Sequence, residues 1–164
     1  MTGVQTCALP ICAFAQEFGI DGDAEVPAGA LARIDFERRD DRLFDTIAHA
    51  DLCKKFAIYP QEDCTPLFEN FVRAAKRGNV AIEINTAGLR KPCREIYPNQ
   101  NLLELAFKAS VPITFGSDAH ATNEVGMNFN EALQLARNVG YSQACRFTNR
   151  RREIVELPTE VAVL

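Results

Sequence analysis

The 164-residue sequence contains no tryptophan and only two histidines, His49 and His120. It lacks an apolar run of membrane-spanning length and any internal repeat, which argues against a transmembrane helix or a solenoid. It also lacks a basic excess: 22 acidic against 18 basic residues give a formal net charge of −4. We therefore expect no nucleic-acid partner and no membrane partner. An anionic substrate would have to be attracted by a local metal or arginine.

Cysteine is present without paired spacing. The six cysteines are Cys7, Cys12, Cys53, Cys64, Cys93 and Cys145. Such scatter favours reduced cysteines in a cytoplasmic protein over a disulfide framework or a cysteine metal site. A secretory signal is not predicted, because no Lys or Arg precedes the apolar stretch 7–15 and Pro10 interrupts it.

The chain divides into four parts by sequence character. We interpret residues 1–12 as translated sequencing-adaptor sequence rather than native protein, and we expect the natural start to lie upstream. Residues 13–41 are a lead-in with weak signals, residues 42–158 hold the domain, and residues 159–164 form a tail.

From residue 43 onward, apolar strands alternate with amphipathic helices. Strands are predicted over 43–48, 80–85, 112–117 and 144–148, and helices over 66–77, 100–110 and 128–139. Thr65 and Asn99 are the predicted N-caps of the first two helices. The alternation predicts an α/β fold with a parallel sheet covered by helices. A barrel is favoured over an open doubly wound sheet, because chemistry gathers at strand ends and no Gly-rich phosphate loop is present.

Both histidines follow predicted strands, and each lies two residues from an aspartate. Asp118 and His120 follow one strand, and His49 and Asp51 follow another. Residues at i and i+2 of an extended chain face the same side, so each pair suits a divalent metal. Taken singly, each motif has a simpler interpretation: a hydrogen-bonded Asp-His pair, a core histidine, or, for Arg90, a solvated turn.

Several motifs in order resemble one family. The segment 83–92 (EINTAGLRKP), the segment 95–98 (EIYP) and the segment 112–120 (PITFGSDAH) resemble the PHP-type histidinol-phosphate phosphatases, over roughly residues 43–157. The resemblance implies a distorted (β/α)₇ TIM-like barrel and a cluster of divalent metals, which could be zinc, iron or manganese. It implies hydrolysis of a small-molecule phosphate ester, L-histidinol phosphate, in histidine biosynthesis.

The same resemblance implies roles for individual residues. His49, Asp118 and His120 would be metal ligands, with Asp118 and His120 at the catalytic centre and Asp118 bridging metal and water. Arg90 would bind the substrate phosphate with its planar fork. Asn85 would orient the Arg90 loop or stabilise its turn, and Glu83 is interpreted as structural.

The sequence departs from the family pattern at its beginning. The family's opening His-x-His motif and its next His and Glu ligands have no counterpart here, and Ala48 replaces a glycine. We therefore expect the C-terminal half of the barrel, an incomplete metal cluster, and a fragment that is inactive alone. The alternatives are a PHP phosphoesterase of other specificity and a non-catalytic PHP-like binding module. The oligomeric state stays open.

Overall fold

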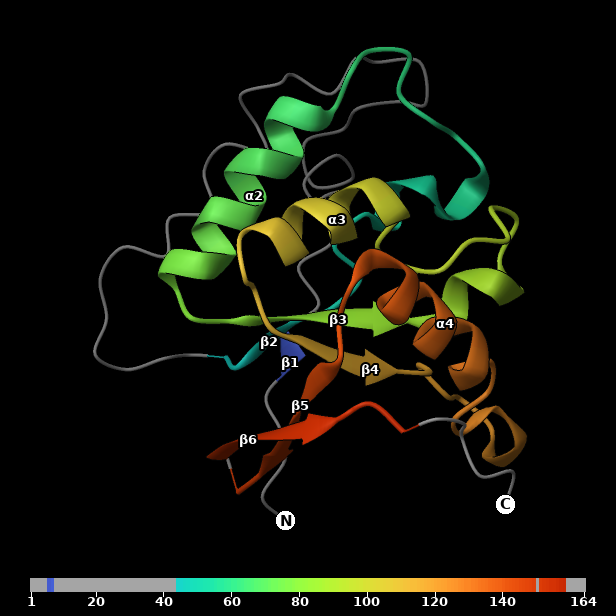
Figure 1. Cartoon of the computed structure of the whole chain (residues 1–164). Coiled ribbons are helices and arrows are strands. Elements are labelled where there is room, and N and C mark those ends of the chain that lie inside the picture. Colours follow the sequence, from blue (N-terminus) through green and yellow to red (C-terminus); the bar gives the residue numbers. More distant parts are fainter. Residues whose placement is uncertain (1–5, 8–43, 150, 159–164) are drawn as a thin grey trace.

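The computed structural model describes residues 6–7, 44–149 and 151–158. The predicted lead-in 13–41 and the tail 159–164 lie outside the described residues. The described chain is a mixed α/β structure built on a four-stranded sheet with the order β1-β2-β3-β4. These strands are β1 (Thr6–Cys7), β2 (Thr46–Ile47), β3 (Ala81–Asn85) and β4 (Ile113–Gly116), and each neighbouring pair is parallel. The predicted parallel sheet is thus present (Figure 1).

The first strand comes from the segment that we interpreted as adaptor sequence and left out of the fold. Thr6 and Cys7 pair with Thr46 and Ile47 at the edge of β2. The sequence did not predict this strand, because two residues are too few to show a hydrophobic periodicity.

The two faces of the sheet differ in character. Ile82 and Ile84 of β3 point to the face that packs against helices, and both are fully buried. Glu83 and Asn85 alternate with them and therefore face the other side. Their register partners on β4 are Thr114 and Gly116, so the opposite face of the sheet carries polar groups.

Among the described residues, three α-helices follow the strands: α2 (Thr65–Arg77), α3 (Gln100–Lys108) and α4 (Phe129–Val139). The predicted cap of α3 is confirmed, because the Asn99 side chain accepts a hydrogen bond from the Leu102 N–H at 2.9 Å. The predicted cap of α2 is wrong. Thr65 is already helical, and its N–H donates to the Asp63 carboxylate at 2.9 Å, so an acidic side chain two residues upstream satisfies this donor.

The helices bury their apolar stripes on the sheet in two clusters. Helices α2 and α3 lie together over β2 and β3 (Figure 1). The first cluster consists of Ile47, Ala50, Phe71, Val72, Ala75, Val80, Ile82, Leu102, Ala106 and Val111. The second consists of Ile84, Leu103, Ile113, Ala132, Ala136 and Ala144. In the described part of the chain, no helix is both long and apolar enough to cross a membrane.

The last predicted strand behaves differently from the others. β5 (Gln143–Thr148) pairs antiparallel with β6 (Arg151–Glu156) in a separate two-stranded sheet, and β6 was not predicted. β6 has the sequence RREIVE and lacks a period-two alternation of apolar and polar residues, so its strand character is seen only once β5 supplies partners such as Arg146 for Glu153. The hairpin lies beside β4, where the Thr114 hydroxyl donates to the Cys145 carbonyl at 3.0 Å.

Three short 3₁₀ helices complete the described chain and lie in the loops: η2 (Leu52–Phe56), η3 (Thr86–Arg90) and η4 (Thr122–Glu124). Each follows the carboxyl end of one parallel strand: η2 follows β2, η3 follows β3 and η4 follows β4. The carboxyl ends of parallel strands meet at one edge of a sheet, so these loops gather the side chains described next.

Candidate functional site

Three neighbouring strands deliver polar side chains to the same edge of the sheet. His49 lies two residues after β2, Asn85 is the last residue of β3, and Asp118 lies two residues after β4. His49 and Asp118 both have positive φ, 52° and 48°. Such left-handed backbone is uncommon outside glycine and is concentrated at functional positions. The chain turns sharply at both residues.

The two turns bring His49 and Asp118 together. The distance from His49 Nε2 to Asp118 Oδ2 is 3.4 Å. Two ligands bound to one tetrahedral metal at about 2.0–2.2 Å lie roughly 3.3–3.6 Å apart. Within the described chain, His49 Nδ1 is buried without a hydrogen-bond partner. The imidazole and the carboxylate therefore fit a pair of ligands to a divalent cation.

His120 is placed differently. Its side chain is exposed, and its Nδ1 lies 2.8 Å from the main-chain carbonyl of Asp118 rather than beside that residue's carboxylate. Among residues 6–7, 44–149 and 151–158, no group of three or more His, Cys, Asp or Glu side chains is arranged to hold a metal. Of the three predicted ligands, the structure joins His49 and Asp118 and leaves the His120 ring turned onto the backbone.

Glu83 lies on the same face and close to this pair. Burial raises the pKa of Glu83, against the opposing effects of the Asn85 hydrogen bond and of His49, and the charge of Asp118 raises it further. Gly116 makes room for this carboxylate, because a Cβ there would lie 2.5 Å from Glu83 Cδ. The half-buried Glu83 carboxylate therefore lies beside the His49–Asp118 pair.

Asn85 connects Glu83 to the loop that carries Arg90. Its Nδ2 donates to Glu83 Oε1 at 2.6 Å, and its Oδ1 accepts the Ala87 N–H at 2.9 Å. The side chain is 1% exposed and caps η3. Both interpretations considered for Asn85, orienting the loop and stabilising its turn, describe this one arrangement.

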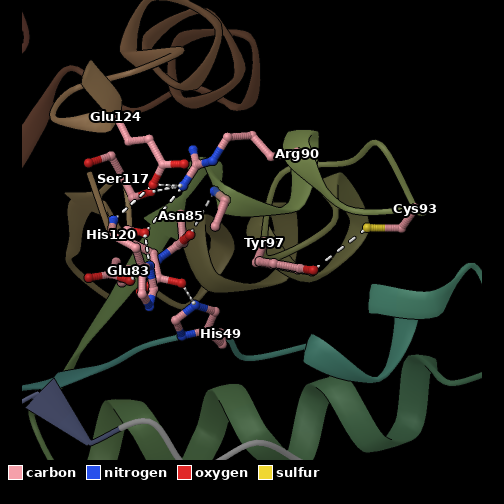
Figure 2. A network of polar contacts seen from close by, with 11 residues as sticks. His49, Glu83, Asn85, Arg90, Cys93, Tyr97, Ser117, His120 and Glu124 are labelled. Carbon is pink, nitrogen blue, oxygen red and sulfur yellow. Dashed lines mark hydrogen bonds and ion pairs between the residues drawn. The ribbon is translucent and has the colours of Figure 1, made fainter. Parts of the chain in front are cut away.

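Arg90 reaches back over the strand ends. Its Nη2 donates to the carbonyls of Ser117 at 2.8 Å and Asp118 at 3.2 Å, and it lies 3.6 Å from Glu124 Oε2. Figure 2 shows the side chain extending from its loop toward Ser117 and Glu124. Nη2 of the guanidinium is thus fixed by the Ser117 and Asp118 carbonyls, and the buried Nη1 has no hydrogen-bond partner among the described residues.

Glu124 joins the Arg90 loop to the turn that holds His120. Its Oε2 accepts the His120 N–H at 2.8 Å and faces Arg90. The hydrogen bond from the His120 backbone lowers the pKa of Glu124, and the charge of Arg90 acts in the same direction. Glu124 is therefore ionised at neutral pH.

A buried ionic cluster lies behind the site. Lys54, 3% exposed, lies 3.0 Å from Asp51 Oδ2 and 2.9 Å from Glu95 Oε2, and it donates to the Ile96 carbonyl at 2.8 Å. Burial raises the pKa of Asp51 even though Lys54 opposes this. The Asp51 carboxylate contacts Lys54 and the Asn99 N–H, so Asp51 and His49 do not face one point after β2.

Tyr97 links the cluster to the metal-ligand pair. Its ring is 1% exposed and lies 5.7 Å from the His49 ring and 5.5 Å from Lys54 Nζ. Tyr97 also bridges to Asn85 through two backbone hydrogen bonds. The residue supports His49 from one side and the end of β3 from the other.

Sequence reasoning interpreted Glu83 as structural and did not place Glu124 or Lys54 in this region. A signal existed for Glu83, because a glutamate between two buried isoleucines of one strand must face the opposite side. Glu124 contacts Arg90 across 34 positions of chain, and Lys54 contacts Glu95 across 41. These contacts depend on the geometry of the loops, which no local pattern encodes.

Comparisons with known proteins place the chain beside histidinol-phosphatases, while no family model matches it. It is 38% identical over 111 residues to the "Probable histidinol-phosphatase" of Deinococcus radiodurans, covering 68% of this chain and 42% of that protein. It is 30% identical over 109 residues to the protein of that name from Schizosaccharomyces pombe, covering 60% and 35%.

A third relative is the "Histidinol-phosphatase" of Bacillus subtilis, 30% identical over 93 residues, with 54% of this chain and 35% of the relative covered. The chain thus spans between about a third and two fifths of the length of these three proteins.

Proposed function

We propose that the described residues form the C-terminal half of the active site of a metal-dependent histidinol-phosphate phosphatase with a PHP-type (β/α)₇ barrel. The reaction is hydrolysis of L-histidinol phosphate to L-histidinol and phosphate, in the cytoplasm. The observation that carries the proposal is that the His49–Asp118 pair and the unpartnered Nη1 of Arg90 belong to one set of strand-end loops. The names of the relatives agree with it.

The sheet supports the barrel. Strands β2, β3 and β4 are parallel, with helices over one face and Glu83, Asn85 and Thr114 on the other. A cavity of about 430 Å³ opens on that polar side, between the sheet and the β5–β6 hairpin. An inner face that carries polar and ionisable groups at its carboxyl edge is the arrangement of barrel enzymes.

In this proposal, His49 Nε2 and Asp118 Oδ2 hold a divalent zinc, iron or manganese ion, and further ligands complete the cluster. When bound, the metal would supply a nucleophile at neutral pH and offset charge on the leaving oxygen. Mixed nitrogen and oxygen donors suit all three metals.

The residues of the chain have separate tasks. Arg90 binds the substrate phosphate, while its Nη2 stays on the Ser117 and Asp118 carbonyls. Asn85 holds the loop and the Glu83 carboxylate in place.

A chimaeric enzyme tests the proposal. The 111-residue matched segment of the Deinococcus radiodurans protein is replaced by the corresponding segment of this chain, and phosphate release from L-histidinol phosphate is measured. We expect metal-dependent turnover, abolished by Asp118→Asn and reduced by Arg90→Lys, which keeps the charge but loses the fork. The unmodified relative and the chain alone are assayed in parallel, and we expect the chain alone to be inactive.

A folded chimaera that releases no phosphate while the unmodified relative is active would refute the proposal. Equal turnover of a generic aryl phosphate would instead favour a PHP phosphoesterase of other specificity. Manganese binding that is indifferent to His49→Ala would favour the non-catalytic binding module.

A further inference from the structure

The outer edge of the β5–β6 hairpin has no strand partner among the described residues. β6 pairs only with β5, and it runs along the lower edge of the described chain in Figure 1. The pairing is continuous from Arg151 to Glu156, without a bulge, and β6 contains no proline and no lysine. Bulges, prolines and lysines are the usual devices that keep an edge strand from pairing with another chain. β6 has none of these devices.

The register with β5 decides which peptide groups of β6 face the open edge. The Leu157 N–H donates to the Ser142 carbonyl at 2.8 Å. Along an antiparallel ladder, residues that bond to the neighbouring strand alternate with residues that do not, so every second residue before Leu157 also faces β5. The N–H and C=O groups of the residues between them, Arg152, Ile154 and Glu156, therefore point outward.

The same three residues form a charge pattern that is complementary to itself. Their side chains share one face of β6, where Ile154, 56% exposed, lies between Arg152 and Glu156. If a second β6 pairs antiparallel about a two-fold axis at Ile154, Arg152 of each copy lies opposite Glu156 of the other. The two Ile154 side chains then lie opposite each other. Opposite charges and apolar pairs across a ladder stabilise it.

The charges also disfavour the other symmetric registers of β6. An axis at Arg151 or Arg152 places two arginines opposite each other, and an axis at Glu153 or Glu156 places two glutamates opposite each other. An axis at Val155 creates no pair of opposite charges. Of the six residues of the strand, Ile154 is therefore the centre that the charges select.

Both charged side chains are already held within their own chain. Arg152 Nη1 donates to Asn79 Oδ1 at 2.7 Å, and Glu156 Oε1 accepts a hydrogen bond from Gln143 at 2.6 Å. Side chains that are ordered beforehand lose less entropy on association. Ile154 also borders a groove of about 250 Å³ that it shares with Phe107, which is 41% exposed, so the apolar surface continues beyond the strand.

We infer that this edge pairs with the β6 edge of a second copy of the chain, antiparallel and centred on Ile154, to form a symmetric dimer. The contact is isologous, because each copy offers the same strand. One short ladder is a small interface, so the dimer is weak and forms in the micromolar range. The inference does not depend on the proposed function, since it uses no residue of the strand-end loops.

The test is sedimentation velocity of the purified chain from micromolar to millimolar concentration. Arg152→Glu and Glu156→Arg are measured separately and then as an equimolar mixture, with circular dichroism to establish that each variant is folded. Arg151→Glu is the matched control, because it makes the same change of charge on the other face of β6, opposite Leu157 of the second copy. Ile154→Pro removes an outward N–H that β5 does not use.

We expect the wild type and Arg151→Glu to form dimers as concentration rises. Each single charge variant should dimerise about tenfold more weakly or less, because two attractive pairs become two repulsive ones. The mixture should recover the dimer, because both contacts then join opposite charges. Ile154→Pro should weaken the dimer as well.

Three results would overturn the inference. The first is a wild-type chain that stays monomeric throughout, and the second is association that neither the charge variants nor Ile154→Pro weakens. The third is a mixture that stays monomeric although both variants are folded. If a single charge variant does not fold, the double variant Arg152→Glu/Glu156→Arg decides, because it keeps opposite charges across the contact. A folded, monomeric double variant would also overturn the inference.

Discussion

Replacement of Lys54 by methionine tests the buried ionic cluster behind the site. Methionine keeps the unbranched stem but removes the ammonium, which contacts Asp51, Glu95 and the Ile96 carbonyl at 2.8–3.0 Å. Glu95 is 43% exposed on its side chain and can return to water, whereas Asp51 is 3% exposed and cannot. The variant therefore leaves one ionised carboxylate buried, with the Asn99 N–H still bound.

Breaking a buried ion pair from one side costs about 3–5 kcal/mol. A domain of this kind is stable by about 5–15 kcal/mol, so the variant loses a large share of its stability. With urea slopes of about 1–3 kcal/mol per M, we expect the midpoint to fall by on the order of 1–5 M. Lys108→Met, at the exposed end of α3, is the matched control and should change stability by about 0.5 kcal/mol or less.

The stability loss caused by Lys54→Met should depend on pH. Burial already raises the pKa of Asp51 above 3.8, and loss of Lys54 raises it further. A carboxyl group with a raised folded-state pKa destabilises the fold at high pH, and this penalty disappears below the unfolded-state pKa. The deficit of the variant should therefore be full at neutral pH and shrink on acidification. The double variant with Asp51→Asn should recover part of it.

The reasoning is refuted if Lys54→Met costs less than about 1 kcal/mol at neutral pH, or if the deficit grows as the pH falls. Either result would mean that the Asp51 carboxylate is not buried as an ion that depends on Lys54.

Three further changes test the packing around the site. Gly116→Ala places a methyl group against the Glu83 carboxylate and should cost about 1–3 kcal/mol in urea unfolding; in the Glu83→Ala background the same change should cost markedly less. Asn85→Ala removes the cap of η3 and should cost about 0.5–2 kcal/mol in urea unfolding. Leu102→Ala, at a fully buried position, should cost about 2–5 kcal/mol, and a smaller loss would contradict the first core cluster.

Sequence patterns predicted the local elements well where one period dominated. Helices α2 and α3 and strands β3 and β4 lie within about two residues of their predicted bounds, because their apolar residues recur at one clear spacing. The β5–β6 hairpin was missed as a separate sheet, because strand direction depends on the partner and not on the strand's own residues.

In the candidate site, too, some features could be predicted from local sequence and others depend on the folded chain. The convergence of His49 and Asp118 could be predicted, because strand ends in a parallel sheet meet at one edge. The diversion of Asp51 to Lys54 could not be predicted, because the turn at His49 rotates the following residues away from the site. The contact between Arg90 and Glu124 depends on two loops that only the folded chain brings together.

The most direct test of the account is manganese binding by the purified chain, followed through the EPR signal of free Mn²⁺. Manganese is chosen because it prefers oxygen and nitrogen donors to the thiols of the cysteines. We predict that His49→Ala and Asp118→Asn each weaken binding at least about tenfold, while Glu69→Gln leaves it unchanged. Superimposable titrations for the wild type and all three variants would contradict the claim that His49 and Asp118 share a metal.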